Sequence, residues 1–208
     1  MKEPQDSEEF IAQQKAILAE NPECANSHYN LGVSYMEQGD MEKAIDSFNE
    51  SISESGRMFE AFVNLGYIYF KRGEMENVVE ANLRAVEIEP RYARGYANLG
   101  FAYLQMLKTD EAIEALNKAI ELNPDIAQAR ANLINAFLQK DDVAKAIQVG
   151  EELVKMAPEF SLGHNNLAAA YYNSGEHEKA VEHLDMALNL GFQAHPDFIK
   201  MLEPFRSK

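Results

Sequence analysis

Five asparagines recur every 34 residues, and their amides are the main binding chemistry in this sequence. Each amide offers two hydrogen-bond donors and an acceptor, enough to pair with the N–H and the C=O of a peptide bond. A row of such amides can hold an extended backbone without reading its side chains. The alternative is that the amides bond to water or to a neighbouring helix. The five residues are Asn30, Asn64, Asn98, Asn132 and Asn166.

Hydrogen bonds alone hold a peptide weakly, because each contributes only about 0.5–1.5 kcal/mol after water is displaced. Ordering the peptide consumes much of that gain. Apolar side chains near the asparagines are therefore predicted to add contact. The alternative is that they pack against the adjacent helix. The other expected members of this peptide-binding surface are Tyr29, Tyr67, Phe70, Arg94, Phe101 and Leu104.

A repeat of 34 residues must position these side chains, because the dipeptide Leu-Gly recurs at Leu31, Leu65 and Leu99. Each repeat is predicted to contain two helices. Counting from the first residue of each repeat, positions 4, 7, 8 and 11 form the packed face of the first helix. The asparagines occupy position 6, on a second face formed by positions 2, 5, 6, 9, 12 and 13. The predicted repeats are 25–58, 59–92, 93–126, 127–160 and 161–194.

The helix ends follow the same period. Glycines at Gly39, Gly73 and Gly175 are predicted to end first helices, where a left-handed residue is favoured. Prolines 34 residues apart follow the second helices of repeats two, three and four. The third repeat has Leu107 in place of the turn glycine. The fourth has Arg130 and Gly150 at packing positions, so we expect it to be the least well packed.

This pattern resembles the tetratricopeptide repeat family over about four-fifths of the chain. The resemblance implies an all-α fold, a right-handed α-α superhelix whose first helices line a concave groove. Chaperone-binding members hold a peptide carboxylate with a lysine at position 5. Here that position holds no lysine in any repeat, so binding to chaperone tails is disfavoured.

The two ends of the chain are predicted to extend the repeat. Residues 1–24, with Phe10, Ile17 and Leu18, are expected to form a half-repeat helix. Residues 195–208 are expected to form a capping helix, with an apolar face toward the last repeat and a charged face toward water. The whole chain is then one continuous domain. The apolar face of the cap comprises Phe198, Met201, Leu202 and Phe205, and the charged face comprises Lys200, Glu203 and Arg206.

The composition excludes several classes of partner. A formal net charge of −15 argues against binding to nucleic acid or to an anionic membrane surface. No apolar run is long enough to span a bilayer, and the N-terminus lacks a signal peptide, so a cytoplasmic location is expected. The predicted groove carries only Glu37, Glu60, Lys71 and Arg94, whose charges cancel. A neutral groove suits a peptide rather than an ion.

Catalysis, a cofactor and a metal site are not expected. The sequence has no glycine-rich phosphate loop and no Gly-x-Ser-x-Gly motif. His177 and His183 lie six residues apart and are predicted to be solvated on different helix faces. The single cysteine, Cys24, is expected to be an unreactive thiol.

These observations predict a non-enzymatic adaptor that binds a peptide or protein segment in its groove. The alternative is a scaffold that assembles through its ends or edges. At the N-terminal end, Phe10, Ile11, Ile17 and Leu18 could contact another copy. A substrate-recruiting module of an enzyme is disfavoured, because the chain has no second domain for catalysis. The sequence leaves open whether the protein is a monomer or a homo-oligomer.

Overall fold

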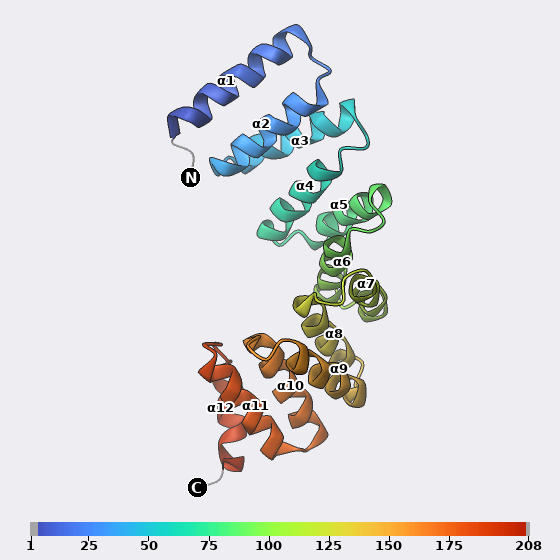
Figure 1. Cartoon of the computed structure of the whole chain (residues 1–208), viewed down its shortest axis with the longest axis vertical. Coiled ribbons are helices and arrows are strands. Elements are labelled where there is room, and N and C mark those ends of the chain that lie inside the picture. Colours follow the sequence, from blue (N-terminus) through green and yellow to red (C-terminus); the bar gives the residue numbers. More distant parts are fainter. Residues whose placement is uncertain (1–3, 207–208) are drawn as a thin grey trace. The chain divides into compact units, whose positions relative to one another are not determined.

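A computed structural model describes residues 4–206 of the chain, and side chains from residue 8 onward. The chain divides into two compact parts, Met1–Gly95 and Tyr96–Lys208, here called the N-terminal and the C-terminal unit. Every regular element of the described residues is helical (Figure 1). The all-α fold class predicted from the sequence is confirmed.

Consecutive helices pair within each unit. In the N-terminal unit the helices are α1 (Pro4–Glu20), α2 (Ala25–Glu37), α3 (Met41–Glu54), α4 (Phe59–Arg72) and α5 (Met75–Ile88). Helix α6 (Ala93–Gln105) begins at the end of this unit. In the C-terminal unit the helices are α7 (Thr109–Leu122), α8 (Ala127–Gln139), α9 (Val143–Met156), α10 (Ser161–Ser174), α11 (His177–Asn189) and α12 (Pro196–Leu202), followed by the 3₁₀ helix η1 (Glu203–Phe205). Each predicted repeat thus contains one first helix and one second helix.

Turns between paired helices contain a residue in the left-handed conformation. Gly73 and Gly175 have φ of 75° and 85°, as the turn glycines predict. Leu107 and Asp141 take the same conformation with φ of 58° and 59°, although a side chain there is disfavoured. The geometry of the turn is therefore kept in repeats three and four without the glycine.

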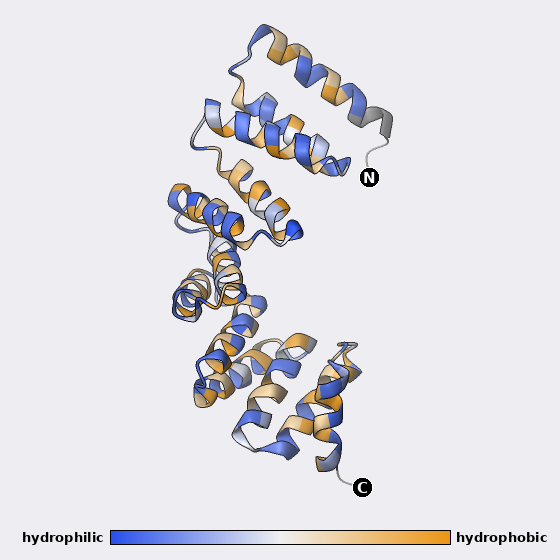
Figure 2. Cartoon of the chain, turned by 180° about the vertical axis from the view of Figure 1, so that it is seen from behind, coloured by the Kyte–Doolittle hydropathy of each residue, from blue (hydrophilic) through white to orange (hydrophobic). Residues whose placement is uncertain are grey.

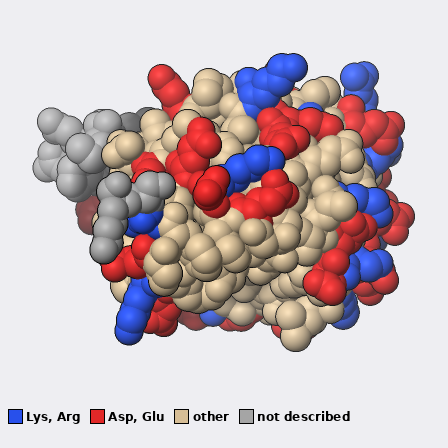
Figure 3. Space-filling model, turned by 90° about the horizontal axis from the view of Figure 1, so that it is seen from below, with Lys and Arg blue, Asp and Glu red and all other residues tan. Residues whose placement is uncertain are grey.

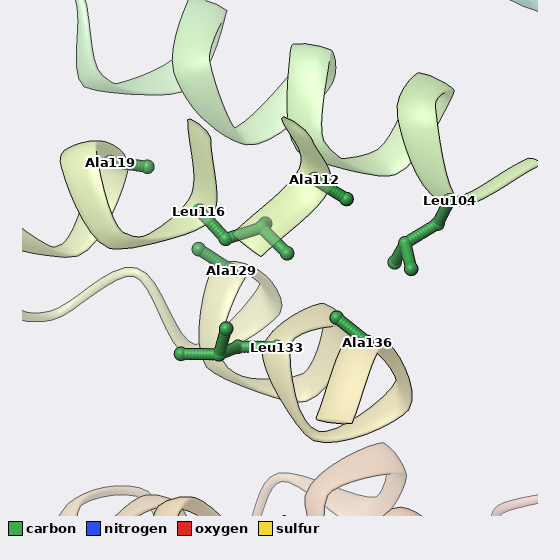
Figure 4. Packing of buried hydrophobic residues seen from close by; sticks show 7 residues of the cluster. All are labelled: Leu104, Ala112, Leu116, Ala119, Ala129, Leu133 and Ala136. Atoms are coloured by element: carbon green, nitrogen blue, oxygen red, sulfur yellow. The ribbon is translucent and has the colours of Figure 1, made fainter. Parts of the chain in front are cut away.

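The Leu-Gly dipeptides have a steric explanation: the glycine at position 8 faces a large side chain of the second helix. A Cβ atom at Gly32 would lie 2.6 Å from the ring of Phe48, and one at Gly100 would overlap Leu116. Figure 4 shows Leu116 of α7 between α6 and α8, in a cluster with Leu104 and Leu133. Glycine thus lets two helices approach closely enough to bury a leucine or a phenylalanine.

Repeat four reverses this arrangement. Ile134 stands at position 8 and is fully buried, while the small residue Gly150 stands in the second helix. Leu167 of the next repeat fills the space beside Gly150, where an added Cβ would lie 2.7 Å from its Cδ1 atom. The prediction of loose packing at Gly150 is therefore wrong, because neighbouring side chains compensate.

Position 4 of the first helix has two kinds of residue. In repeats two and three it holds the aromatic residues Phe62 and Tyr96. In repeats one, four and five it holds an N–H donor that reaches the carbonyl oxygen of the proline six residues earlier. These pairs are His28 with Pro22 at 2.8 Å, Arg130 with Pro124 at 3.2 Å and His164 with Pro158 at 2.9 Å. Arg130 therefore ties its helix to the preceding loop rather than weakening it.

The C-terminal segment packs against α11 through most of the predicted apolar face, with Met201 as the exception. Leu202 is fully buried, and Phe198 and Ile199 pack beside it. Met201, predicted to face the last repeat, is 46% exposed. Arg206, predicted to face water, forms a two-pronged ion pair with Asp185 at 2.6 and 2.8 Å. The change to a 3₁₀ helix near Pro204 ends the α-helical period on which the prediction was based.

Helix α1 packs on α2 through Ile11 and Gln14, which are buried. Ile17, predicted to be part of its apolar face, is 39% exposed. In Figure 2 most helices carry a hydrophobic and a hydrophilic side, as expected of helices packed along one face. None of the helices among the described residues combines the length and the apolar character needed to cross a membrane.

Candidate functional site

The asparagines at position 6 are used partly to join neighbouring first helices. The Nδ2 atom of Asn64 donates to the Tyr29 hydroxyl of α2 at 3.4 Å. Asn166 donates in the same way to the Ala131 carbonyl of α8 at 3.0 Å. Asn30 donates to the Gln14 side chain of α1 at 3.2 Å. In these three places the amide bonds to a neighbouring helix, which is the alternative that the sequence left open.

The remaining two asparagines differ in exposure. Asn132 is only 6% exposed, and its Oδ1 atom accepts a hydrogen bond from Gln128 at 3.2 Å. Asn98 lies on α6 and is exposed. Among the five, Asn98 therefore offers the most accessible amide to a ligand.

A shallow groove of about 440 Å³ lies between α6 and α8 of the C-terminal unit. Every residue that lines it occupies position 6, 9, 12 or 13 of its repeat, which is the face predicted from the sequence. Three of the predicted site residues meet there. The lining residues are Phe101, Leu104, Gln105, Asn132, Asn135, Leu138 and Gln139.

The lining of this groove is neutral and mixes amides with apolar side chains. Leu104 is 5% exposed, so it belongs mainly to the core and contributes only a small area. Gln139 accepts a hydrogen bond from Thr109 at 3.0 Å. The Asn135 side chain has no hydrogen-bond partner among the described residues. The groove can therefore offer unused amide groups beside an apolar floor.

Gln105, Asn135, Leu138 and Gln139 were not among the residues singled out from the sequence. The sequence nevertheless placed them on the predicted groove face, because they stand at positions 9, 12 and 13 of repeats three and four. The 34-residue register could have identified all four.

A second exposed surface lies on α4 of the N-terminal unit. Tyr67 and Phe70 are 49% and 43% exposed. The Lys71 ammonium group lies 5.5 Å from the centre of the Tyr67 ring, close enough for a cation–π contact. Both side chains are exposed, and their contact with a partner stays a prediction.

The other two predicted site residues have different surroundings. Tyr29 packs its ring against Phe48, with the ring centres 5.8 Å apart, and its hydroxyl accepts from Asn64. Arg94 is exposed near the start of α6. Tyr29 is thus mainly a packing residue, whereas Arg94 is accessible.

The histidines of α11 are not solvated as predicted. His177 stacks on Phe205, with ring centres 3.9 Å apart, and its Nδ1 atom is buried without a hydrogen-bond partner among the described residues. His183 is half-buried against Tyr171 and His164. Sequence spacing separated these two side chains correctly but could not show which residues of other elements cover them.

Cys24 occupies the N-cap position of α2. Hydrogen bonds from the Ser27 side chain and backbone lower the pKa of its thiol. Basic side chains on its own helix were the feature considered from the sequence, and the effect of Ser27 was missed.

Family models match the chain along both units. Models described as tetratricopeptide repeat match residues 25–54, 93–126 and 165–191, and a model described as TPR repeat matches residues 66–106. Together they cover more than half of the chain. Repeat four lies outside these matches, and it is the repeat that holds Arg130 and Gly150.

Solved structures share this fold. A crystal structure of MamA is 26% identical, with a TM-score of 0.72, over 77% of this chain and 94% of that chain. MamA from Desulfovibrio magneticus RS-1 is 19% identical, with a TM-score of 0.73, over 80% and 94%. YrrB, a TPR protein with an unusual peptide-binding site, is 18% identical, with a TM-score of 0.74, over 86% of this chain and 92% of that chain. No curated protein matches the chain significantly in sequence.

Proposed function

Since this chain belongs to the tetratricopeptide repeat family, we propose that it is a non-enzymatic adaptor that binds an extended, uncharged peptide segment of a protein partner. The observation that carries the proposal is the neutral groove between α6 and α8, with four amide side chains beside Phe101, Leu104 and Leu138. Amides pair with peptide groups, and the apolar side chains supply the contact area that hydrogen bonds lack.

The lack of charge in this groove favours an uncharged ligand segment. A charged side chain placed there would lose water without gaining an ion pair, which is costly. The chain as a whole is strongly acidic, and acidic and basic side chains are interspersed on the face shown in Figure 3. A net charge of −15 also supports a protein partner over nucleic acid.

Selection from a displayed library of random 12-residue peptides would test this groove. The full chain is expected to enrich peptides with a central uncharged stretch. The Gln139→Glu variant keeps the acceptor for Thr109 but adds a charge, so it is expected to lose these peptides. A matched control is Asn117→Asp on α7, which adds the same charge outside the groove. Enrichment of the same peptides by wild type and by Gln139→Glu would contradict the proposal.

The second part of the proposal concerns the five asparagines. Because three of their amides bond to neighbouring helices, we expect fewer ligand contacts from them than the sequence suggested. An amide that donates one hydrogen bond to a neighbouring helix keeps a second N–H and its oxygen. Asn98 is exposed, whereas Asn166 is buried and bonded to Ala131. Asn98→Ala is expected to weaken peptide binding by about 2–10-fold. Asn166→Ala is expected to lower stability. Unchanged binding in Asn98→Ala would remove Asn98 from the ligand site.

Self-assembly is the second candidate function, and exposed apolar residues of the C-terminal segment support it. Met201 and Phe205 are 46% and 38% exposed. Another copy of the chain could cover them. Light scattering over a hundredfold range of concentration would test this candidate, with Met201→Gln as the matched variant. A monomer at every concentration would rule it out.

We further propose that the five repeats form one continuous domain in the cytoplasm, without a resident cofactor. The unbroken 34-residue register supports the single domain. Coincident unfolding curves from circular dichroism and from tyrosine fluorescence are expected, and two separated transitions would contradict it.

A further inference from the structure

Two histidine rings meet between the helices of repeat five. His164 of α10 is buried, and His183 of α11 is half-buried. Their Nδ1 atoms lie 3.0 Å apart. The Nε2 atom of His164 lies 2.9 Å from the Pro158 carbonyl oxygen, in the loop before α10. The pair thus links α10, α11 and that loop.

The hydrogen bonds fix where the protons lie. A carbonyl oxygen only accepts, so the Nε2 atom of His164 carries a hydrogen. In neutral His164 the Nδ1 atom is then an acceptor, and His183 must donate from its own Nδ1 atom. One added proton leaves the hydrogen bond intact, because the ring that stays neutral can still accept at its Nδ1 atom. A second proton would place two N–H groups face to face at 3.0 Å, so the hydrogen bond and double protonation of the pair exclude each other.

The surroundings also disfavour a charge on His183. Its ring stacks between His164 and Tyr171, with ring centres 5.3 and 5.6 Å away. Burial, followed by the neighbouring His164, lowers the pKa of His183, and Lys179 acts in the same direction. Glu182 and Glu151 act in the opposite direction but do not outweigh burial.

The other polar groups near the pair are already engaged. The Tyr171 hydroxyl donates to the Glu151 carboxylate of α9 at 2.6 Å. The Lys179 ammonium group lies 4.9 Å from the centre of the Tyr171 ring. Glu151 therefore serves Tyr171 rather than acting as the direct partner of a charged imidazole.

We propose that the His164–His183 pair is a pH-sensitive latch that holds α10 against α11 at neutral pH and holds them less tightly in mildly acidic solution. The closed latch needs an unprotonated Nδ1 atom on one of the two rings. A second proton on the pair removes that acceptor and breaks the hydrogen bond, and burial against Tyr171 disfavours a charge on His183.

The direction of the effect follows from proton binding. Histidine in the unfolded chain has a pKa near 6.5, so two unfolded histidines bind two protons below that pH, whereas the closed pair can hold only one. Stability is therefore full above about pH 6.5 and falls as the solution becomes more acidic. Exclusion of one proton raises the unfolding equilibrium constant by up to about tenfold between pH 7.5 and 5.5.

Urea unfolding of the full chain at both pH values, in wild type and in His183→Asn, tests the latch. Asparagine keeps an N–H donor near the position of Nδ1 but does not titrate. The matched control is His28→Asn, because His28 makes the same contact with a proline carbonyl but faces no second histidine. His183→Asn is expected to lose up to about tenfold of the pH effect, and His28→Asn to retain it. An unchanged pH effect in His183→Asn would overturn the proposal.

Nuclear magnetic resonance of the wild-type rings gives a test that does not depend on a variant. The ¹⁵N shifts are expected to show His183 with its hydrogen on Nδ1 and His164 with its hydrogen on Nε2. His183 is also expected to titrate at lower pH than histidine in the urea-unfolded chain. A hydrogen on Nε2 of neutral His183, or titration as in the unfolded chain, would show that the latch does not exist.

Discussion

Substitution of Leu202 by alanine tests how far the C-terminal segment stabilises the last repeat. The Leu202 side chain is fully buried, in a cluster with Leu184 of α11 and Leu167 of α10. Replacement of a buried leucine by alanine costs about 2–5 kcal/mol, depending on how well the site can collapse. Because α12 is short and near the chain end, we expect the lower half of this range, about 2–3 kcal/mol.

The neighbouring Met201 supplies a matched control on the same helix. It is 46% exposed, so Met201→Ala is expected to change stability by less than about 0.5 kcal/mol. Urea unfolding followed by circular dichroism measures both variants. Equal stability of Leu202→Ala and Met201→Ala would refute the claim that this segment caps the repeat. Deletion of residues 195–208 is expected to lower the melting temperature further and to cause aggregation, because it exposes the same apolar face.

Three further changes probe the backbone and the surface. Leu107→Gly is expected to raise stability by about 1 kcal/mol, measured by urea unfolding, because φ is 58° there. Gly150→Ala is expected to lower the melting temperature, because its Cβ would lie 2.7 Å from Leu167. The hydrogen bond and ion pair with Lys145 lower the pKa of the Asp142 carboxyl. This contribution is present above pH 4 or so and is lost as the pH falls through the lowered value, so Asp142→Asn should reduce the acid sensitivity of urea unfolding.

The repeat register predicted the helices and the groove face because both follow from spacing along one chain. Position 8 had to be small wherever the second helix carries Phe48 or Leu116. The sequence also placed Phe101 and Asn132 on one face, and both line the groove.

The spacing of residues along the chain could not predict hydrogen-bond and ion-pair partners that lie in other helices. Asn166 donates to Ala131, 35 residues away, and Arg206 pairs with Asp185 in another helix. Each depends on side-chain directions after packing. The same limit applies to His183, whose partner lies in α10 rather than on its own helix.

Calorimetry with a peptide selected by the full chain tests the central claim that the α6–α8 groove binds an uncharged segment. Asn135→Ala removes an amide from the groove, and Asn117→Ala removes an exposed amide from α7 as the control. Loss of one or two hydrogen bonds predicts a Kd about 2–10-fold weaker for Asn135→Ala. The control is expected to retain the wild-type Kd. Wild-type affinity in Asn135→Ala, or an equal loss in both variants, would contradict the proposed groove.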